Sequence, residues 1–219
     1  MTTYVITGAS RGIGLEYCRQ LQNRGDEVIA VCRSTSDELS TLGIRVESGI
    51  DVTQDEAVAD LARRLQGDRI DVLINNAGII KSDSLSNLNF DHIRQQFEVN
   101  ALGALRVTRA LLPRLRKGAK VVMMTSRMGS IEDNTSGGYY GYRMSKAAMS
   151  MLGKSLANDL RDRGVAVAIL HPGMVSTRMT DFSGISTEES VKNLIQRIDE
   201  LSLATTGTFW HAKGEVLPW

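Results

Sequence analysis

Residues 7–14 read TGASRGIG, and this glycine-rich stretch decides the fold. It follows the short β-rich run 4–7 and opens the helical pattern 12–24. Glycines at such a turn let a pyrophosphate reach the helix N-terminus, where free amides and the helix dipole attract phosphate. Glycine triplets also occur in plain turns. The position between the first strand and the first helix favours a dinucleotide-binding loop.

Strands and helices alternate along the rest of the chain. The sequence predicts strands at residues 4–7, 27–32, 45–48, 72–75, 119–125 and 165–170, with a short last one at 208–210. It predicts helices at about 12–24, 54–66, 90–116, 140–163 and 188–203, with Gly118 in the turn after the longest. This order predicts the α/β class, with one Rossmann-type domain over residues 1–219. Its doubly wound, mostly parallel seven-stranded sheet would carry helices on both faces.

The bulk composition excludes several classes of protein. A net charge of +1 and 5% aromatic residues give no basic surface for nucleic acid or an anionic membrane. No run approaches the roughly 18 apolar residues of a membrane span, and the N-terminus lacks a signal-peptide pattern, so we expect a cytoplasmic protein. The three histidines and the two cysteines, Cys18 and Cys32, show neither metal-site nor disulfide spacing.

Tyr142 and Lys146 are the strongest candidates for catalysis. Four residues apart near the start of a predicted helix, they share one helix face. A neighbouring ammonium favours the phenolate, so we expect a lowered tyrosine pKa and a phenol that exchanges a proton with a carbonyl or alcohol oxygen. Tyr139 and Tyr140 are alternatives, but only Tyr142 has the lysine four residues later.

Several motifs in order resemble the short-chain dehydrogenase/reductase family. They are Gly-x3-Gly-x-Gly at 8–14, NNAG at 75–78 and Tyr142-x3-Lys146, and the resemblance covers essentially the whole chain. The ending 207–219 resembles the C-factor-like branch, which also contains carbonyl-reductase-like members. The resemblance implies that Ser126 bonds the substrate oxygen and that Asn100 holds a water in the proton relay to Lys146. Alternatively, Ser126 is a turn residue at the end of a strand, and Asn100 is a polar helix residue whose hydrogen bonds are satisfied within the protein.

The resemblance also implies a set of cofactor-binding residues. Asp51 and Val52 resemble an adenine contact, although Asp51 could instead cap the helix that follows it. Residues 76–78 would line the adenosine side, and residues 172–177 would contact the nicotinamide carboxamide, with Thr177 as a helix cap the alternative. The full set is Gly8, Ser10, Arg11, Gly12, Ile13, Gly14, Arg33, Ser34, Asp51, Val52, Asn76, Ala77, Gly78, Tyr142, Lys146, Pro172, Gly173, Val175 and Thr177.

The end of the second strand predicts a preference for NADP(H), with NAD(H) possible. NAD-dependent Rossmann proteins place an acid there for the ribose hydroxyls. Here that position reads Cys32, Arg33 and Ser34. The Arg33 guanidinium offers donors to a 2′-phosphate, and Arg11 could close on it from the other side. The alternative is a solvated loop arginine.

The sequence therefore predicts an oxidoreductase, an NADPH-dependent carbonyl reductase acting on a small-molecule carbonyl or alcohol. A cofactor-binding regulatory protein with incidental turnover is the alternative, and the C-factor resemblance keeps it open. The resemblance also implies a homodimer or homotetramer, paired through the helices 90–116 and 140–163. The apolar ending 216–219 would either add a second subunit contact or pack on its own subunit.

Overall fold

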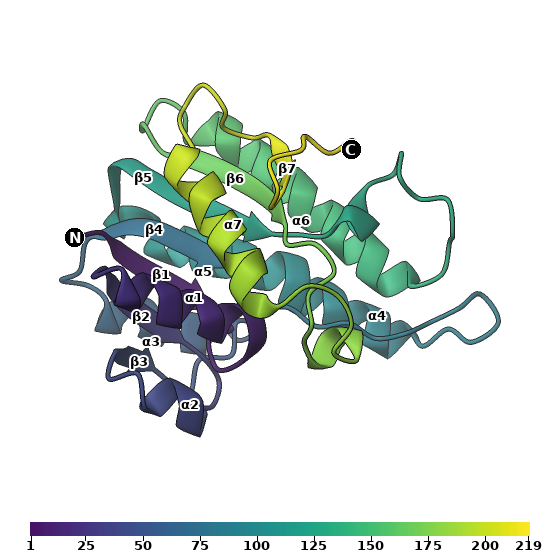
Figure 1. Cartoon of the computed structure of the whole chain (residues 1–219), viewed down its shortest axis with the longest axis horizontal. Coiled ribbons are helices and arrows are strands. Elements are labelled where there is room, and N and C mark those ends of the chain that lie inside the picture. The colour runs from purple at the N-terminus through teal and green to yellow at the C-terminus, as the bar shows by residue number, and fades with distance from the viewer.

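A parallel sheet of seven strands forms the centre of the computed structural model, which describes residues 1–219 (Figure 1). The strands are β1 Thr3–Thr7, β2 Glu27–Val31, β3 Arg45–Glu47, β4 Ile70–Asn75, β5 Leu115–Met124, β6 Ala166–His171 and β7 Phe209–His211. Their order is β3-β2-β1-β4-β5-β6-β7, and every pair is parallel. The predicted Rossmann-type fold is confirmed. The order reverses between β1 and β4, where ligands bind in such sheets.

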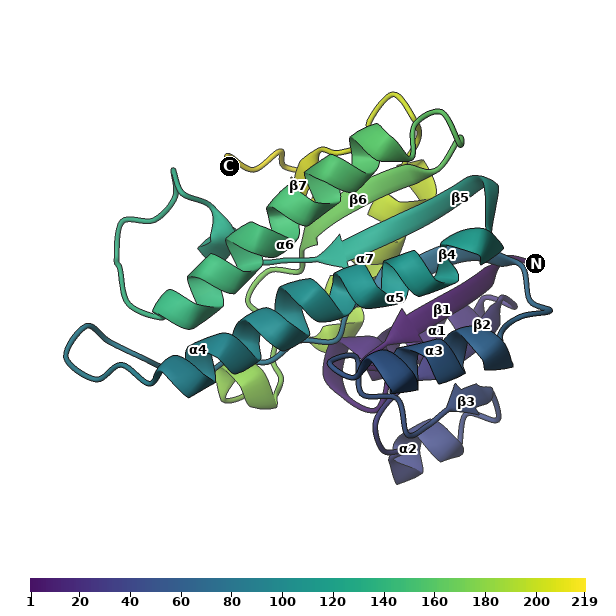
Figure 2. The same cartoon turned by 180° about the vertical axis from the view of Figure 1, so that it is seen from behind.

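Helices cover both faces of the sheet. They are α1 Gly12–Asn23, α2 Asp37–Ser40, α3 Asp55–Arg64, α4 Phe90–Phe97, α5 Gly103–Leu111, α6 Tyr140–Asp159 and α7 Thr187–Glu200. Helices α1 and α7 lie on one face, and α3, α5 and α6 lie on the other (Figures 1 and 2). Alternate residues of β5 enter the two cores: Val121 and Met123 on one side, Val122 and Met124 on the other. None of the helices combines the length and apolar character needed to cross a bilayer.

The expectation of one continuous helix over residues 90–116 is wrong, because the α-helix is interrupted and ends before residue 116. A π-helical segment, Glu98–Leu102, separates α4 from α5, and α5 ends at Leu111 before a short 3₁₀ turn that contains Pro113. Proline has no amide hydrogen, so it cannot continue the α-helical ladder. Strand β5 begins at Leu115, and Gly118 lies inside it with φ +88° instead of in a turn. The sequence also missed the short helix α2, which Ser36 caps through Leu39 N.

The chain ending packs on its own subunit. Residues 209–217 form a small hairpin, in which His211 N donates to Glu215 O and Leu217 N donates to Phe209 O. Leu217 is buried in the core, and the ring of Trp219 lies 5.7 Å from the ring of Phe209. Val216 and Trp219 remain exposed, so a second subunit contact through this segment stays a prediction.

Candidate active site

The glycine loop after β1 has no room for side chains. Gly8 has φ +67°, and a Cβ on it would lie 2.8 Å from the Ala77 Cα. A Cβ on Gly14 would lie 2.3 Å from the Gly8 carbonyl oxygen. Backbone atoms cannot yield at that distance, so the loop requires glycine at both positions.

The NNAG motif holds this loop in place. The Asn76 side-chain amide donates to the carbonyls of Thr7 and Gly8, at 3.0 and 3.2 Å. In return, the Thr7 hydroxyl accepts hydrogen bonds from the main-chain amides of Asn76 and Ala77. The motif therefore ties β4 to the end of β1, at the point where the strand order reverses.

The N-terminus of α1 fits a phosphate group. No side chain caps it, and no acidic residue lies in its first turn. In contrast, Ser36, Asn89 and Ser186 cap α2, α4 and α7. A helix start with uncapped amides and a positive dipole end, preceded by a glycine-rich loop, can hold a pyrophosphate.

Arg33 and Asp51 meet at the outer end of this site. Their side chains approach to 3.8 Å and line a cavity of about 290 Å³ together with Thr53, Gln54, Gln95, Glu98 and Val99. Asp51 accepts hydrogen bonds from the Thr53 amide and hydroxyl, and α3 starts beyond it with Gln54 as N-cap. Asp51 is therefore not the helix cap. Burial raises the pKa of Asp51, but the Thr53 bonds and the Arg33 charge outweigh it and lower the pKa.

Arg33 has an acidic neighbour in the structure, which the sequence did not indicate. Its side chain is 68% exposed, and Asp51 lies beside it. Ser34 and Arg11 are exposed on the same edge of the molecule, but no contact links them to Arg33. Because exposed ion pairs are weak, Arg33 can still turn towards an incoming phosphate.

Tyr142 and Lys146 lie together in the first turns of α6, and both are buried. The Lys146 Nζ is 5.7 Å from the centre of the Tyr142 ring and donates to the Met124 carbonyl at 2.8 Å. Ser126, just after β5, is buried beside Tyr142, and its side chain acts to lower the pKa of the Tyr142 hydroxyl. Gly129 lets this segment approach α6, because a Cβ there would lie 2.7 Å from the Lys146 carbonyl carbon.

The pKa of Tyr142 shifts in the direction opposite to the expectation. Burial raises the pKa of Tyr142 to about 12, and only the hydrogen bond from Ser126 opposes it. Burial also lowers the pKa of Lys146 to about 8. Desolvation disfavours both charged forms, so in this arrangement it outweighs the attraction that the sequence argument relied on.

Asn100 lies in the π-helical segment and is fully buried. Its Oδ1 accepts from the Ile79 amide at 2.8 Å, and its Nδ2 donates to the Ile79 carbonyl and to the Ser145 hydroxyl, both at 2.9 Å. The side chain therefore links the segment after NNAG to α6. Both amide hydrogens are already used, so the polar group is satisfied within the protein.

The segment after β6 closes over the glycine loop. Thr177 Cγ2 lies 3.5 Å from the position of a Cβ on Gly12, and the Thr177 hydroxyl caps a 3₁₀ turn through Met179 N. Val175 is buried, and the Pro172 carbonyl accepts from the Ser190 hydroxyl. Thr177 acts as a cap, as the alternative held, and it also lies beside the loop.

Two histidines that are far apart in sequence meet near this segment. The rings of His171 and His211 are 5.1 Å apart in an edge-to-face arrangement. Burial, then the neighbouring His211, lowers the pKa of His171 to about 3, which keeps this imidazole neutral. No group of three potential ligands surrounds them or occurs elsewhere in the chain.

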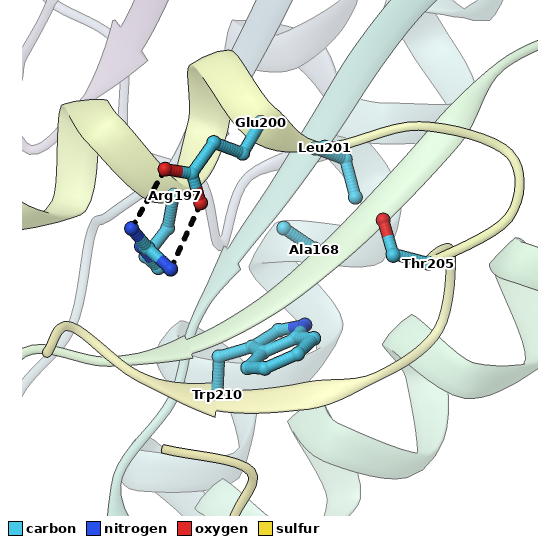
Figure 3. Close-up of a pocket in the computed structure, with 6 residues that line it drawn as sticks. All are labelled: Ala168, Arg197, Glu200, Leu201, Thr205 and Trp210. Carbon is cyan, nitrogen blue, oxygen red and sulfur yellow. Dashed lines mark hydrogen bonds and ion pairs between the residues drawn. The ribbon is translucent and has the colours of Figure 1, made fainter. Parts of the chain in front are cut away.

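A second cavity lies away from these residues, between the end of α7 and the strands β6 and β7 (Figure 3). It measures about 200 Å³ and is lined by Ala168, Arg197, Glu200, Leu201, Thr205 and Trp210. Arg197 is paired with Glu200 across two hydrogen-bond contacts. None of the predicted site residues lines this cavity.

Sequence reasoning missed the groups that support the site. Asp83, Gln96 and Thr125 are buried polar residues next to α6. Thr125 Oγ1 donates to the Lys146 carbonyl at 3.0 Å, and Gln96 accepts from the Lys81 amide at 2.9 Å. Their sequence neighbours form no motif, so only the fold reveals them.

Comparison with known proteins agrees with this geometry. The profile of the family described as short chain dehydrogenase matches residues 2–188. The 1-hydroxy-2-glutathionyl-2-methyl-3-butene dehydrogenase of Rhodococcus sp. (strain AD45) is 46% identical over 226 residues, covering 100% of both chains. The C-signal protein of Myxococcus xanthus is 44% identical over 154 residues, covering 68% of this chain and 93% of the relative.

A solved structure with the same architecture is the NADPH-bound carbonyl reductase from chicken fatty liver. It superposes with a TM-score of 0.89 at 28% identity, covering 100% of this chain and 99% of the other. In this chain, the glycine loop, the NNAG tie and the buried Tyr142–Lys146 pair occur on the fold that it shares with the chicken enzyme. The chain is an oxidoreductase of the short-chain dehydrogenase/reductase family, in its C-factor-like branch.

Proposed function

We propose that residues 1–219 form one dinucleotide-binding and catalytic domain that interconverts a carbonyl compound and its alcohol with NADP(H). The observation that carries this proposal is the buried pair of Tyr142 and Lys146, whose Nζ lies 3.5 Å from the position of a Cβ on Gly78 of the NNAG motif. A protein that only binds a dinucleotide does not need a desolvated phenol and ammonium at this point. A purely regulatory role is therefore the weaker reading.

Each residue has a role in this proposal. When bound, the nicotinamide supplies or accepts the hydride. The Ser126 hydroxyl bonds the substrate oxygen, and the Tyr142 phenol donates its proton to that oxygen in reduction or accepts it in oxidation. Lys146 donates to the Met124 carbonyl and, at 3.8 Å, to Met149 Sδ; in this proposal it would turn its other hydrogens to the nicotinamide ribose and the phenolate. Asn100 fixes the segments around this relay.

The proposed cofactor contacts follow the same edge of the sheet. The glycine loop and the start of α1 would hold the pyrophosphate, Asp51 and Val52 the adenine, and residues 76–78 the adenosine side. Pro172, Gly173, Val175 and Thr177 would meet the nicotinamide. The support is their common position after the carboxyl ends of β1, β3, β4 and β6.

The choice of NADP(H) depends on Arg33. The chicken carbonyl reductase binds NADPH, and β2 of this chain ends without an acid that would repel a 2′-phosphate. Asp51 opposes this preference in part, since it competes for the guanidinium. We propose that Arg33 leaves Asp51 for the phosphate, because a charge-assisted bond to phosphate is stronger than an exposed ion pair at 3.8 Å.

Arg33→Ala should weaken NADPH binding by about tenfold and leave NADH binding nearly unchanged. A charge-assisted contact is worth about 1.5–3 kcal/mol, and the exposure of Arg33 favours the low end. Fluorescence titration with both cofactors measures the ratio. Arg63→Ala, at an equally exposed arginine on α3, is the control. A wild-type protein that prefers NADH, or an unchanged ratio in Arg33→Ala, removes Arg33 from this role.

We propose small-molecule substrates in which the reacting carbon carries a carbonyl or hydroxyl group. The names of the Rhodococcus dehydrogenase and the chicken carbonyl reductase describe the two directions of that chemistry. The test is a panel of aldehydes, ketones and alcohols with reduced or oxidised cofactor, followed by absorbance. Turnover of none of these classes would contradict the proposal.

We expect a homodimer or homotetramer in solution. Helices α4 and α5 follow one another along one line beside α6 (Figure 2), and these helices carry the exposed residues Leu105, Met144 and Met151. Light scattering at micromolar concentration should show at least a dimer, and Leu105→Glu with Met151→Glu should shift it towards monomer. Leu203→Glu, a partly exposed leucine after α7, is the control. A monomeric wild type would rule out the oligomer.

A further inference from the structure

The N-terminus of α6 is capped from a distant part of the chain. Its own N-cap residue, Tyr139, has φ 49° and makes no capping bond with its side chain. The carboxylate of Asp83 instead accepts from the amides of Tyr140 and Gly141, at 2.5 and 3.1 Å. The Asp83 carbonyl accepts from the Tyr139 amide at 3.0 Å. Asp83 is 8% exposed, so these amides lose their cap when it is removed.

The segment that leads to Asp83 is held by two buried side-chain amides: Gln96 of α4, and Asn100 of the π-helical segment that follows α4. Going backwards along the chain from Asp83, every second residue is anchored. Gln96 accepts from the Lys81 amide, and Asn100 bonds both the amide and the carbonyl of Ile79. Gln96 and Asn100 are fully buried. The carboxylate therefore lies at the end of a segment that is anchored at Ile79 and Lys81.

The same segment is coupled to the second turn of α6. Asn100 donates to the Ser145 hydroxyl, which donates to the Tyr142 carbonyl, both at 2.9 Å. Gly141 packs directly against α4, because a Cβ on it would lie 2.4 Å from Gln96 Nε2. Tyr142 thus lies between two anchor points, Asp83 at the first amides and Ser145 one turn later.

We propose that Asp83 is a positioning residue for Tyr142. Its carboxylate fixes the first turn of α6 and faces the positive end of a 20-residue helix, where a negative charge is stabilised. Without it, the first turn would fray and the phenol would move relative to Ser126. Misplacement by about 1 Å can reduce a rate by about a hundredfold, so the effect should appear in turnover. This inference rests on the proposed role of Tyr142.

The test compares Asp83→Ala and Asp83→Asn with Ser186→Ala. Ser186 caps α7, which carries none of the catalytic candidates, through Glu189 N at 3.0 Å. Asp83→Ala should lower kcat by about tenfold or more, with the Kd for NADPH within about twofold of wild type. Asp83→Asn keeps one acceptor and should retain more activity than Asp83→Ala. Ser186→Ala should lower the melting temperature with little change in kcat.

Equal kcat values for Asp83→Ala and Ser186→Ala, each assayed below its melting temperature, would overturn the inference. If Asp83→Ala does not fold, Asp83→Asn carries the test, and wild-type kcat in that variant overturns it. Tyr142→Phe separates this failure from failure of the proposed function. An inactive Tyr142→Phe beside a fully active Asp83→Ala would reject only the positioning role.

Discussion

Replacing Tyr142 with phenylalanine should lower the rate of hydride transfer by about 10²- to 10⁴-fold, the usual contribution of a positioned acid or base. The ring that fills the buried site remains, so the Kd for NADPH should stay within about twofold. Only the hydroxyl that contacts Ser126 is lost. Single-turnover absorbance measurements with a reactive carbonyl give the rate, and fluorescence titration gives the affinity.

The adjacent tyrosines provide the matched controls for this prediction. Tyr139 and Tyr140 lie immediately before Gly141 and Tyr142 and are less buried than Tyr142. Tyr139→Phe and Tyr140→Phe should keep nearly all activity. If one of these two variants is inactive while Tyr142→Phe turns over normally, the acid lies elsewhere. If all three are fully active, none of these tyrosines supplies the proton, and the proposed catalytic role of Tyr142 is rejected.

Removing the Lys146 amine should reduce both turnover and cofactor affinity. Lys146→Met keeps the buried volume but loses the charge and the donors. We expect a loss of about a hundredfold in turnover and about tenfold in NADPH affinity, from the missing support to the phenolate and the missing ribose contact. The same two measurements separate these effects.

Lys154→Met is the control for Lys146, because it lies on the same helix and contacts the Gly207 carbonyl and the Trp219 ring. It should leave both quantities near the wild-type values. An intact NADPH affinity in Lys146→Met would remove the lysine from cofactor binding. Intact turnover would remove it from the proton relay.

The alternation of strands and helices and the glycine loop could be predicted because short-range patterns indicate them. Gly8 and Gly14 stand six residues apart in one strand-to-helix turn, so their spacing is a local signal, although the contact that requires Gly8 is to the distant Ala77. The Tyr142–Lys146 pair follows in the same way from helix periodicity. These features depend on few residues, which stand close together in the chain.

Other features depend on tertiary packing and have no local signal. The π-helical segment at Asn100 arises where that side chain bonds Ile79 and Ser145, which come from two other parts of the fold. The pKa of Tyr142 depends on burial, which a sequence pattern does not measure. Asp83 caps a helix that begins 57 residues later in the chain, so no sequence pattern near Asp83 or near the helix predicts the contact.

Transfer of a labelled hydride tests the central claim most directly. The protein would be incubated with a reactive carbonyl compound and NADPH or NADH deuterated at C4 of the nicotinamide, on one face or the other. We predict that the alcohol product carries one deuterium on the carbinol carbon. The deuterium should be transferred only when one particular face of the nicotinamide is labelled. Tyr142→Phe should form almost no labelled alcohol. Oxidation of the cofactor without deuterium in any alcohol, or no reaction across the carbonyl panel, would contradict the account.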